Sequence, residues 1–229
     1  MQSFLSSQTR LYIIGQPDAY ILIDSGIQND FDNITKKLSL KGFDWANCTH
    51  LVLTHHHNDH AGNLCEIKQA NPKISFVMTS ACAKLLLEGQ NQMSSQERFS
   101  HPNVEFVTRL YKRINRKIGS SYLPYTLAQN DVTINSDKDF VFNIHVSGRL
   151  ITTPGHTFDS LSLISGDTAY IGDAARNMLN FLGAPYQPLI IQDREMVMKS
   201  WEKILSYDIG RICPSHGHPF AALDLKNNL

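Results

Sequence analysis

The first ninety residues alternate between short apolar runs, which predict buried strands, and apolar positions at helical spacing. The turn residues Gly15-Gln16-Pro17-Asp18 separate two β-favouring runs, so we predict a hairpin here. Phe31, Ile34 and Leu38 recur three and four residues apart, which predicts a helix. The predicted elements are strands at 11–14 and 20–23, a helix through 31–38, a strand at 50–54, a helix through 64–67, a strand at 74–78 and a helix over 80–89.

The rest of the chain predicts one long helix and then mainly strands. A helical pattern over 104–118 ends at Gly119, and Gly166-Asp167 lies between two β-favouring runs as in a second hairpin. The predicted elements are this helix, strands at 140–146 and 150–153 with a turn at 147–148, strands at 161–164 and 169–171, a helix capped by Asp193 and a strand at 209–213. Because strands outnumber what a simple strand–helix alternation needs, we predict an α/β fold with two sheets covered by helices. No repeat or linker divides the chain, so we expect a single domain over 1–229.

The composition is that of a folded protein without a charge excess. Hydrophobic residues make up 42% of the 229 positions, which suffices for a sizeable core. Lys and Arg number 21, as do Asp and Glu, so we expect no nucleic-acid partner. No apolar run reaches the roughly 18 residues of a transmembrane helix, and the N-terminus lacks the features of a signal peptide. We therefore expect no membrane partner and a cytoplasmic location, while the oligomeric state stays open.

Histidine is the unusual residue type, because four of the ten histidines lie within residues 55–60, at the end of a predicted strand. His55 and His57 point to the same side of an extended segment. A turn after them can bring Asp59 and His60 round to face the pair. Scattered surface histidines would each need a partner of their own. Clustered imidazoles with a carboxylate form instead a ligand set that suits zinc or iron.

Three single residues at the ends of later predicted strands extend this pattern. His156 lies in Thr-Pro-Gly-His-Thr, Asp173 in Ile-Gly-Asp and His216 in Pro-Ser-His-Gly. Each of them alone is weak evidence, because a single His is more often structural and a single Asp more often a cap. In α/β folds, however, active sites collect at the ends of buried strands. We therefore expect these three residues to join the histidine cluster.

In this order, the motifs H-x-H-x-D-H, T-P-G-H-T, G-D and S-H-G resemble the metallo-β-lactamase fold superfamily, over nearly the whole chain from Asp24 to His216. The resemblance implies a four-layer αββα sandwich of two mixed sheets covered by helices, with a metal site at one edge. It implies two divalent metal ions, zinc first, with iron or manganese as alternatives. The implied ligands are His55, His57 and His156 for the first ion, Asp59, His60 and His216 for the second, and Asp173 between both.

The resemblance also suggests roles for two aspartates. Asp24 matches an acidic position near the metal site, where its carboxylate would orient a ligand histidine through the free N–H of the ring. As a residue at the end of a predicted strand, Asp24 equally suits a turn. Asp59 is expected to be both a ligand and the catalytic residue, because it can orient the nucleophile and return a proton to the leaving group.

The implied activity is that of a hydrolase, in which a metal-bridging hydroxide cleaves an ester, thioester or lactone of a small molecule. Some zinc β-lactamases carry Cys or Ser where this chain has Asp173. An aspartate at this position instead resembles the glyoxalase II, lactonase and thioesterase branches of the superfamily. A mononuclear iron dioxygenase of sulfur compounds is similar in fold and motif and stays an alternative. A metal-binding effector without catalysis is another alternative, and a nuclease is a third.

The middle of the chain supplies candidate contacts to the substrate. Basic residues fall on one face of the predicted helix at 109–117, and this face is either solvated or docks an anionic substrate such as a CoA ester. Tyr122 and Tyr125 either cover the metals and donate to an oxyanion or pack in an ordinary loop. Arg176, Phe181 and Tyr186 follow Asp173 and are candidates for lining the pocket. The basic residues are Arg109, Lys112, Arg113, Arg116 and Lys117.

Overall fold

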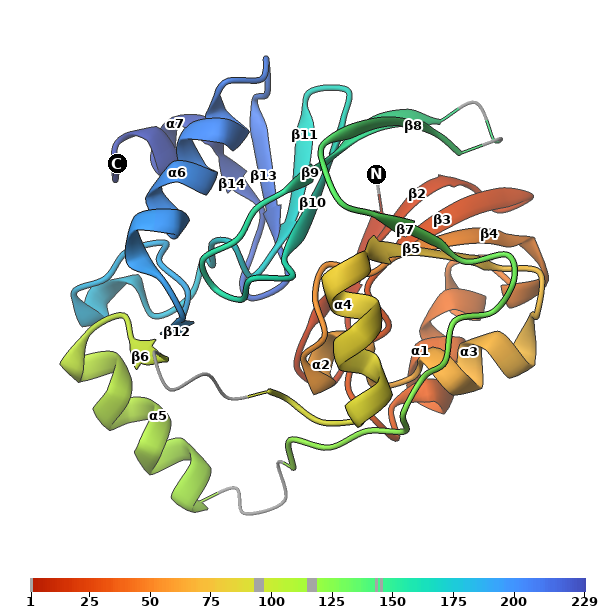
Figure 1. The fold of residues 1–229 in the computed structure, drawn as a ribbon, viewed down its shortest axis with the longest axis horizontal. Coiled ribbons are helices and arrows are strands. Elements are labelled where there is room, and N and C mark those ends of the chain that lie inside the picture. Colours follow the sequence, from red (N-terminus) through yellow and green to blue (C-terminus); the bar gives the residue numbers. More distant parts are fainter. Residues whose placement is uncertain (1, 93–96, 115–118, 143, 145) are drawn as a thin grey trace.

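Two six-stranded sheets pack face to face, and helices cover their outer faces (Figure 1). This computed structural model describes residues 2–92, 97–114, 119–142, 144 and 146–229. The strands are β1 (Gln2–Leu5), β2 (Arg10–Gln16), β3 (Ala19–Ile23), β4 (Cys48–Val52), β5 (Ser75–Thr79), β6 (Arg98–Phe99), β7 (Val132–Ile134), β8 (Lys138–Val141), β9 (Ser147–Thr152), β10 (Leu161–Ser165), β11 (Thr168–Gly172), β12 (Ile190–Ile191), β13 (Arg211–Pro214) and β14 (Phe220–Ala221). The helices are α1 (Phe31–Leu40), α2 (Asn58–Ala61), α3 (Leu64–Ala70), α4 (Ser80–Leu85), α5 (Pro102–Ile114), α6 (Arg194–Leu205) and α7 (Ala222–Lys226), with 3-10 turns η1 (Trp45–Asn47), η2 (Leu86–Glu88) and η3 (Asn180–Leu182).

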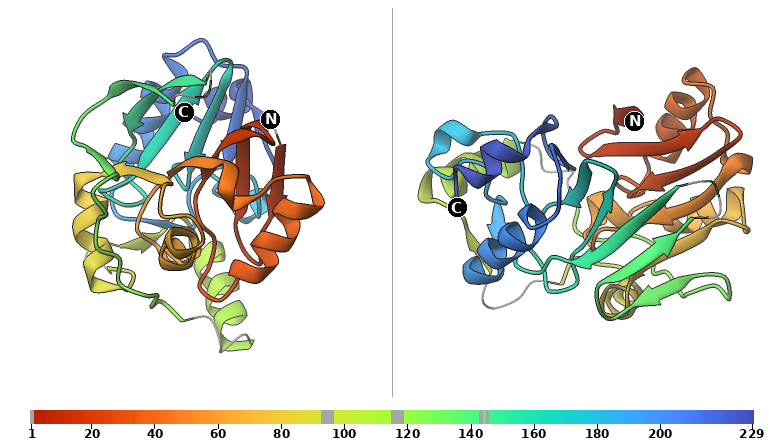
Figure 2. Two further views of the ribbon diagram at one scale, coloured as in Figure 1. Left: turned by 90° about the vertical axis from the view of Figure 1, so that its right-hand side faces the viewer. Right: turned by 90° about the horizontal axis from the view of Figure 1, so that it is seen from above.

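Both sheets mix parallel and antiparallel pairs. The first sheet has the order β1-β2-β3-β4-β5-β7, and the second has the order β14-β13-β11-β10-β9-β8. Strands β3, β4, β5 and β7 run parallel, so the carboxyl ends of β3 and β4 lie at one edge. In the second sheet β11 and β13 also run parallel. The view from above in Figure 2 separates the half with α6 and α7 from the half that begins at the N-terminus.

The apolar core has three layers, which follow from the two-residue period of the strands. In β3, Ile21 and Ile23 face the second sheet, whereas Tyr20 and Leu22 belong to the cluster under α1, α3 and α4. A further cluster lies between the second sheet and helices α6 and α7. Two sheets thus enclose one apolar layer, and each also packs against helices. The predicted four-layer αββα sandwich is confirmed.

The predicted turn at 147–148 is wrong. Strand β8 ends at Val141 and β9 already begins at Ser147, so the strand predicted over 140–146 is also too long. Residues 143 and 145 lie outside the described residues, and beside them the Phe142 N–H donates to the Val146 carbonyl at 2.9 Å. A Cβ at position 148 would lie 2.5 Å from the carbonyl oxygen of Ile164 in β10. Gly148 therefore allows a close approach of two strands and does not mark a turn.

The remaining differences concern the ends of elements and short edge strands. Helix α5 begins at Pro102, two residues before the predicted start, and positions 115–118 of that prediction lie outside the described residues. The apolar pattern misses β1 and β7, because each buries a single side chain, Phe4 in β1 and Ile134 in β7. Within the described ranges, no helix combines the length and the apolar character that crossing a membrane requires.

The packing of α6 on the second sheet can be tested at Trp201. Its side chain is fully buried in the cluster under α6, and its Nε1–H donates to the Ala174 carbonyl at 2.7 Å. We expect Trp201→Ala to lower the free energy of unfolding by roughly 3–5 kcal/mol, through the lost contacts and the cavity left behind. Urea unfolding measures this loss. The exposed neighbour variant Glu202→Ala is the control, and equal stability of the two variants would contradict the packing described here.

Candidate metal centre

The candidate metal ligands follow strands of both sheets and meet in space. After β4 the chain passes through His55 and His57 into the short helix α2, which carries Asp59 and His60. The second sheet contributes one residue after each of β9, β11 and β13. The ligand atoms form three groups, each with all its atoms within 4.8 Å of one another: His55, His57 and His156; Asp59, His60 and His216; His55, His60 and Asp173.

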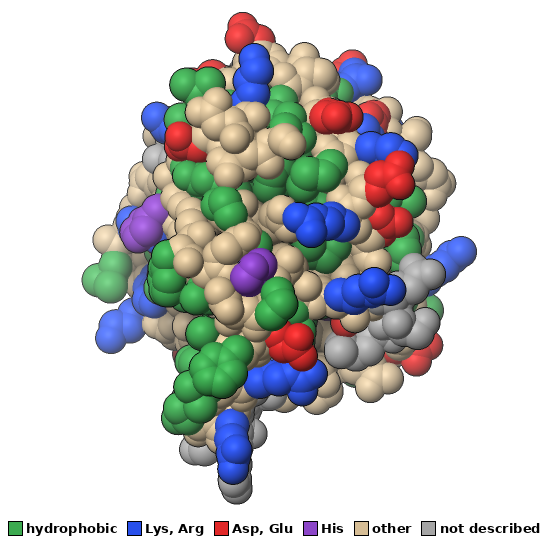
Figure 3. Space-filling model, turned by 90° about the vertical axis from the view of Figure 1, so that its left-hand side faces the viewer, with side chains coloured by type: hydrophobic (Ala, Val, Ile, Leu, Met, Phe, Trp, Pro, Cys, Tyr) green, Lys and Arg blue, Asp and Glu red, His purple; other side chains and the backbone are tan. Residues whose placement is uncertain are grey.

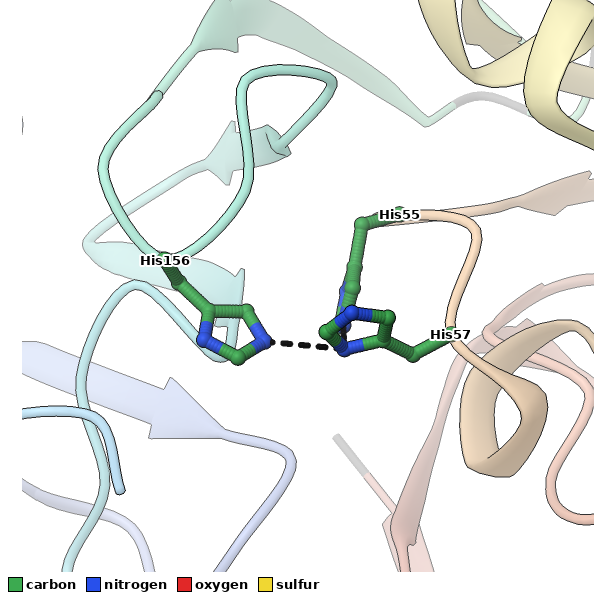
Figure 4. A group of neighbouring side chains, drawn as sticks. All are labelled: His55, His57 and His156. Carbon is green, nitrogen blue, oxygen red and sulfur yellow. Dashed lines mark hydrogen bonds between the residues drawn. The ribbon is translucent and has the colours of Figure 1, made fainter. Parts of the chain in front are cut away.

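The first group has the spacing of a zinc ligand shell. Figure 4 shows the rings of His55, His57 and His156 turned toward one another. His57 Nδ1 lies 3.1 Å from His55 Nε2 and 3.1 Å from His156 Nε2. Tetrahedral ligands with Zn–N bonds of about 2.0–2.1 Å lie roughly 3.3 Å from one another. The three nitrogens are therefore close to the distances that a shared cation requires.

The second group is linked to the first by one carboxylate. Asp59 Oδ2 lies 3.1 Å from His216 Nε2 and 3.6 Å from His60 Nε2. The Asp173 Oδ1 atom lies 3.4 Å from His60 Nε2, and its Oδ2 atom lies 3.4 Å from His216 Nε2. The same Oδ2 atom is 3.6 Å from His156 Nε2 of the first group. Asp173 thus lies between the two groups and contacts both.

Two buried atoms of this centre are placed to bind a cation. His60 Nε2 and Asp173 Oδ1 are shielded from solvent and form no hydrogen bond in the described part of the chain. Buried polar atoms without partners are rare and costly in folded proteins. A divalent cation can bind the lone pair of the imidazole nitrogen and a carboxylate oxygen at the same time. The residues present therefore fit a metal ion.

Asp24 orients one of the histidines from behind. Its carboxylate is fully buried, and Oδ2 accepts the Nδ1–H of His60 at 2.8 Å. The Thr54 N–H donates to Oδ1 at 2.8 Å, and the Thr54 and Ser215 hydroxyls donate to Oδ2 at 3.0 Å. A carboxylate can only accept here, so the ring proton is on Nδ1 and Nε2 is directed into the centre. His156 is held in the same way, because its Nδ1–H donates to the Ile190 carbonyl at 2.7 Å.

Sequence reasoning misses a buried pair that joins the two ligand-bearing loops. The Asp159 carboxylate accepts the His56 backbone N–H at 2.9 Å and the His56 Nδ1–H at 3.0 Å. His56 Nε2 in turn accepts the Gln92 N–H at 3.1 Å. His56 lies between His55 and His57, and Asp159 lies three residues after His156, so this pair ties the loops together. In the sequence, this pair is indicated only weakly, by the position of each residue next to a candidate ligand.

The two histidine groups differ in charge. Burial, with the neighbouring His156, lowers the pKa of His57 to about 3, and burial also lowers the pKa of His55 well below its ordinary value. Burial acts in the same direction on His216, but Asp173 and Asp59 outweigh it and raise the pKa of His216 to about 10. The pKa of His60 rises well above its ordinary value for the same reason. At neutral pH His55 and His57 are therefore uncharged, whereas His60 and His216 hold positive charge against the carboxylates beside them.

Of the two alternatives for Tyr122 and Tyr125, the structure agrees with packing in the core and not with a lid over the centre. Both rings are buried in the apolar cluster under α1, α3 and α4, with 4% and 5% of their surface exposed. The Tyr125 hydroxyl donates to Asp131 Oδ2 at 2.6 Å. The segment turns inward because aromatic side chains gain more from this apolar cluster than from water. These two tyrosines therefore stabilise the fold.

The other pocket candidates lie on the loop between β11 and β12. Arg176 is almost fully buried, burial lowers its pKa to about 10, and one guanidinium nitrogen donates to the Ala184 carbonyl at 3.2 Å. The Phe181 side chain is 83% exposed on η3. The Tyr186 ring packs on Phe220, with 4.6 Å between the ring centroids. The structure therefore gives Tyr186 a packing partner and leaves Phe181 in solvent.

Helix α5, the location of the predicted basic face, forms an arm at the edge of the molecule (Figure 1). Arg109 and Arg113 are exposed, and Arg109 pairs with Glu105 at 2.8 Å. The Lys112 side chain and positions 116–117 lie outside the described residues. Phe106 and Ile114 are 70% and 72% exposed on the same helix, and Figure 3 shows hydrophobic and basic side chains together on this protruding part.

Comparison with known proteins agrees with this arrangement. A family model described as "Metallo-beta-lactamase superfamily" matches residues 7–216. The uncharacterized protein YobT of Bacillus subtilis (strain 168) is 27% identical over 165 residues, which cover 71% of this chain and 60% of YobT. The metallo-beta-lactamase fold-containing protein ST1585 of Sulfurisphaera tokodaii is 23% identical over 196 residues, which cover 84% of this chain and 66% of ST1585. The chain thus spans less than two thirds of the length of both relatives.

Solved structures share the fold. The crystal structure of ST1585 matches with a TM-score of 0.67 at 21% identity, over 99% of this chain and 83% of that chain. A motif mutant of the metallo-beta-lactamase from Cronobacter sakazakii matches with a TM-score of 0.66 at 18% identity, over 94% of this chain and 76% of that chain. At such identities the likeness concerns the fold alone.

The hydrogen bond from His60 to Asp24 predicts a selective effect of Asp24→Asn. The amide cannot accept as strongly, so we expect the affinity of the second group for zinc to fall about 10–100-fold. The first group should keep its affinity, because none of its histidines contacts Asp24. Zinc titration of the metal-free protein against a competing chelator measures both affinities. Asp30→Asn removes a buried carboxylate that binds Ser7 instead and serves as control; equal loss at both sites would refute the selective role.

The charge difference predicts that the two groups bind zinc with different pH dependence. Protons on His60 and His216 compete with a metal ion. Because the pKa of His216 is raised to about 10 and that of His60 is raised well above its ordinary value, the affinity of the second group falls as the pH is lowered. Each proton released contributes about tenfold per pH unit. His57 is already neutral above its pKa of about 3, and burial lowers the pKa of His55 as well, so the affinity of the first group should depend less steeply on pH. Chelator competition at pH 6, 7 and 8 measures the zinc affinity of each group. We expect the affinity of the second group to change more steeply with pH than that of the first, and equal pH dependence of the two affinities would contradict the charge assignment.

Proposed function

The chain belongs to the metallo-β-lactamase superfamily, and from this we propose that it is a hydrolase that uses two divalent metal ions, zinc first, to cleave an ester, thioester or lactone of a small molecule. One observation carries the proposal. The Asp173 carboxylate lies between the two groups of candidate ligands, within 3.6 Å of nitrogens in each. A carboxylate in that position suits two ions that share one substrate-activating site.

The chain's own residues would bind the ions and guide protons. Divalent ions bound there supply Lewis-acid chemistry, which lowers the pKa of a water molecule towards about 7 and polarises a carbonyl. The Asp59 side chain is 18% exposed and that of Asp173 is 14% exposed, whereas Asp24 is fully buried, so water can reach Asp59. The Thr9 hydroxyl donates to Asp59 Oδ2 at 3.3 Å and holds it in place. We propose that Asp59 orients the attacking water and passes a proton to the leaving group.

The residue at position 173 supports the choice of an ester, thioester or lactone bond. An aspartate there resembles the branches that cleave these bonds, whereas some β-lactamases carry Cys or Ser at this position.

The cysteines support a reducing, cytoplasmic site of action. None of Cys48, Cys65, Cys82 and Cys213 is joined in a disulfide, and burial raises the pKa of Cys48 and Cys213 to about 12. Such thiols are inert and form no structural cross-link.

Activity of the metal-loaded protein tests the proposal. Protein loaded with zinc should hydrolyse members of a panel of thioesters, lactones and simple aryl esters, and a chelator should abolish the activity until zinc is restored. Oxygen uptake by an iron-loaded sample with a thiol substrate would favour the dioxygenase instead. Metal binding without turnover of any panel member would favour an effector and contradict the hydrolase.

Asp173→Ala tests the bridging position. Since Asp173 contacts both groups, we expect the variant to lose affinity for both ions and to lose hydrolytic activity by about 10³-fold or more, as for loss of a principal electrostatic group. Asp208→Ala removes an exposed carboxylate and serves as the matched control. Elemental analysis after dialysis and initial rates are the measurements. A variant that keeps two tightly bound ions and full activity would overturn the assignment.

A further inference from the structure

A cavity of about 430 Å³ lies beside the candidate metal centre, against the two-stranded ribbon formed by β6 and β12. Its walls are residues 98–100 from the β6 side and residues 191–194, which run from β12 into the first turn of α6. This volume falls in the range of about 300–1,000 Å³ that is typical of small-molecule sites. None of its lining residues takes part in the metal centre described above.

The wall of this cavity also supports a candidate metal ligand. The Ile190 carbonyl of β12 accepts the Nδ1–H of His156 at 2.7 Å. The backbone N–H groups of Gln192 and Asp193 donate to the Gly155 carbonyl at 2.9 and 3.0 Å. The Gln192 side-chain oxygen accepts the Phe158 N–H at 2.9 Å. The loop that carries His156 is thus bound to the cavity wall on both sides of the histidine, so a group in the cavity is a neighbour of the metal centre.

The cavity offers hydrogen-bond donors without acceptors. Arg98 and Arg194 are exposed and both line the cavity, and among the described residues no carboxylate forms an ion pair with either. The acidic groups nearby are engaged, because Asp193 accepts the Met196 N–H at 3.0 Å and Glu97 accepts the Gln192 side-chain amide at 3.3 Å. The Ser100 hydroxyl is shielded from solvent and forms no hydrogen bond with any described residue.

The positions of these donors favour a phosphate group over a carboxylate. Two guanidinium groups and one hydroxyl can serve at least three acceptor oxygens, which a tetrahedral phosphate presents and a planar carboxylate does not. The cavity also lies at the start of α6, where the helix dipole favours negative charge. Phe99 adds an aromatic wall, and the Arg109 guanidinium lies 5.9 Å from the centre of its ring. An aromatic and cationic wall of this kind suits a phosphorylated group attached to a flat ring.

We propose that this cavity binds a phosphate-bearing part of the substrate, with the phosphate on Arg98 and Arg194 and the attached ring on Phe99. The inference rests on the proposed hydrolase function and narrows its substrates to esters or thioesters whose leaving group carries a phosphate. Binding in the cavity places the phosphorylated end beside β12 and leaves the scissile bond to the metal centre. The phosphate contacts thus come from Arg98 of the ribbon and Arg194 at the start of α6, and Arg109 is the residue of the predicted basic face on α5 that borders this wall.

A pair of thioesters tests the proposal by kinetics. Acetyl-coenzyme A carries phosphates, and S-acetyl-N-acetylcysteamine has the same thioester without them. For the zinc-loaded double variant Arg98→Gln/Arg194→Gln we expect KM for acetyl-coenzyme A to rise about tenfold or more, with kcat within about twofold. KM for S-acetyl-N-acetylcysteamine should stay unchanged. Arg211→Gln removes an exposed arginine at the start of β13 and should change neither value. Equal effects of the double variant on both substrates, or no effect on either, would overturn the proposal.

A binding measurement separates this proposal from the proposed function. Calorimetric titration with ADP should show binding to the zinc-loaded wild type and to Arg211→Gln, weakened about tenfold or more in the double variant. Metal content, measured on the same samples, should be equal in all three. If neither thioester is hydrolysed, the thioester function is wrong, and the titration alone decides this inference. ADP binding that is absent, or equally tight in the double variant because it occurs on the metal ions, would refute it.

Discussion

The negative charge that Asp59, Asp173 and Asp24 bring into one small volume is the constraint on which the centre depends. Carboxylates removed from water need positive charge or several donors beside them. Asp24 is satisfied by hydroxyl, backbone and imidazole donors. Asp59 and Asp173 are matched instead by His60 and His216, whose pKa values they raise. The arrangement favours cations, which agrees with the two atoms of the centre that form no hydrogen bond among the described residues.

Holding these groups together requires contacts between the two halves of the sandwich. His55 and His57 belong to the first sheet, whereas His156 belongs to the second, and each follows a strand whose partners fix its direction. The buried pair of His56 and Asp159 joins the two loops directly. A preorganised centre of this kind loses little entropy when it binds ions or substrate. The sheets therefore act as a rigid support for a site built on strand ends, loops and the short helix α2.

The structure brings the predicted ligand residues together, because most of them follow apolar runs that form neighbouring strands. The topology of the two sheets brings these ligand residues, which are far apart in the chain, to one place. Contacts through the backbone were not predictable, and the Ile190 carbonyl behind His156 is the clearest example. Gly148 was misread as a turn because a glycine required by a neighbouring strand has the same signature as a turn glycine. Tyr122 and Tyr125 were ambiguous, since aromatic residues serve cores and pockets alike.

The position of two ions around Asp173 is the central claim, and anomalous diffraction at the zinc edge tests it most directly. Crystals of protein grown with zinc should show two anomalous peaks, roughly 3.5–4 Å apart, on either side of the Asp173 carboxylate. One peak should lie among His55, His57 and His156, and the other among Asp59, His60 and His216. A single peak within the first group, or peaks that do not involve Asp173, would contradict the account.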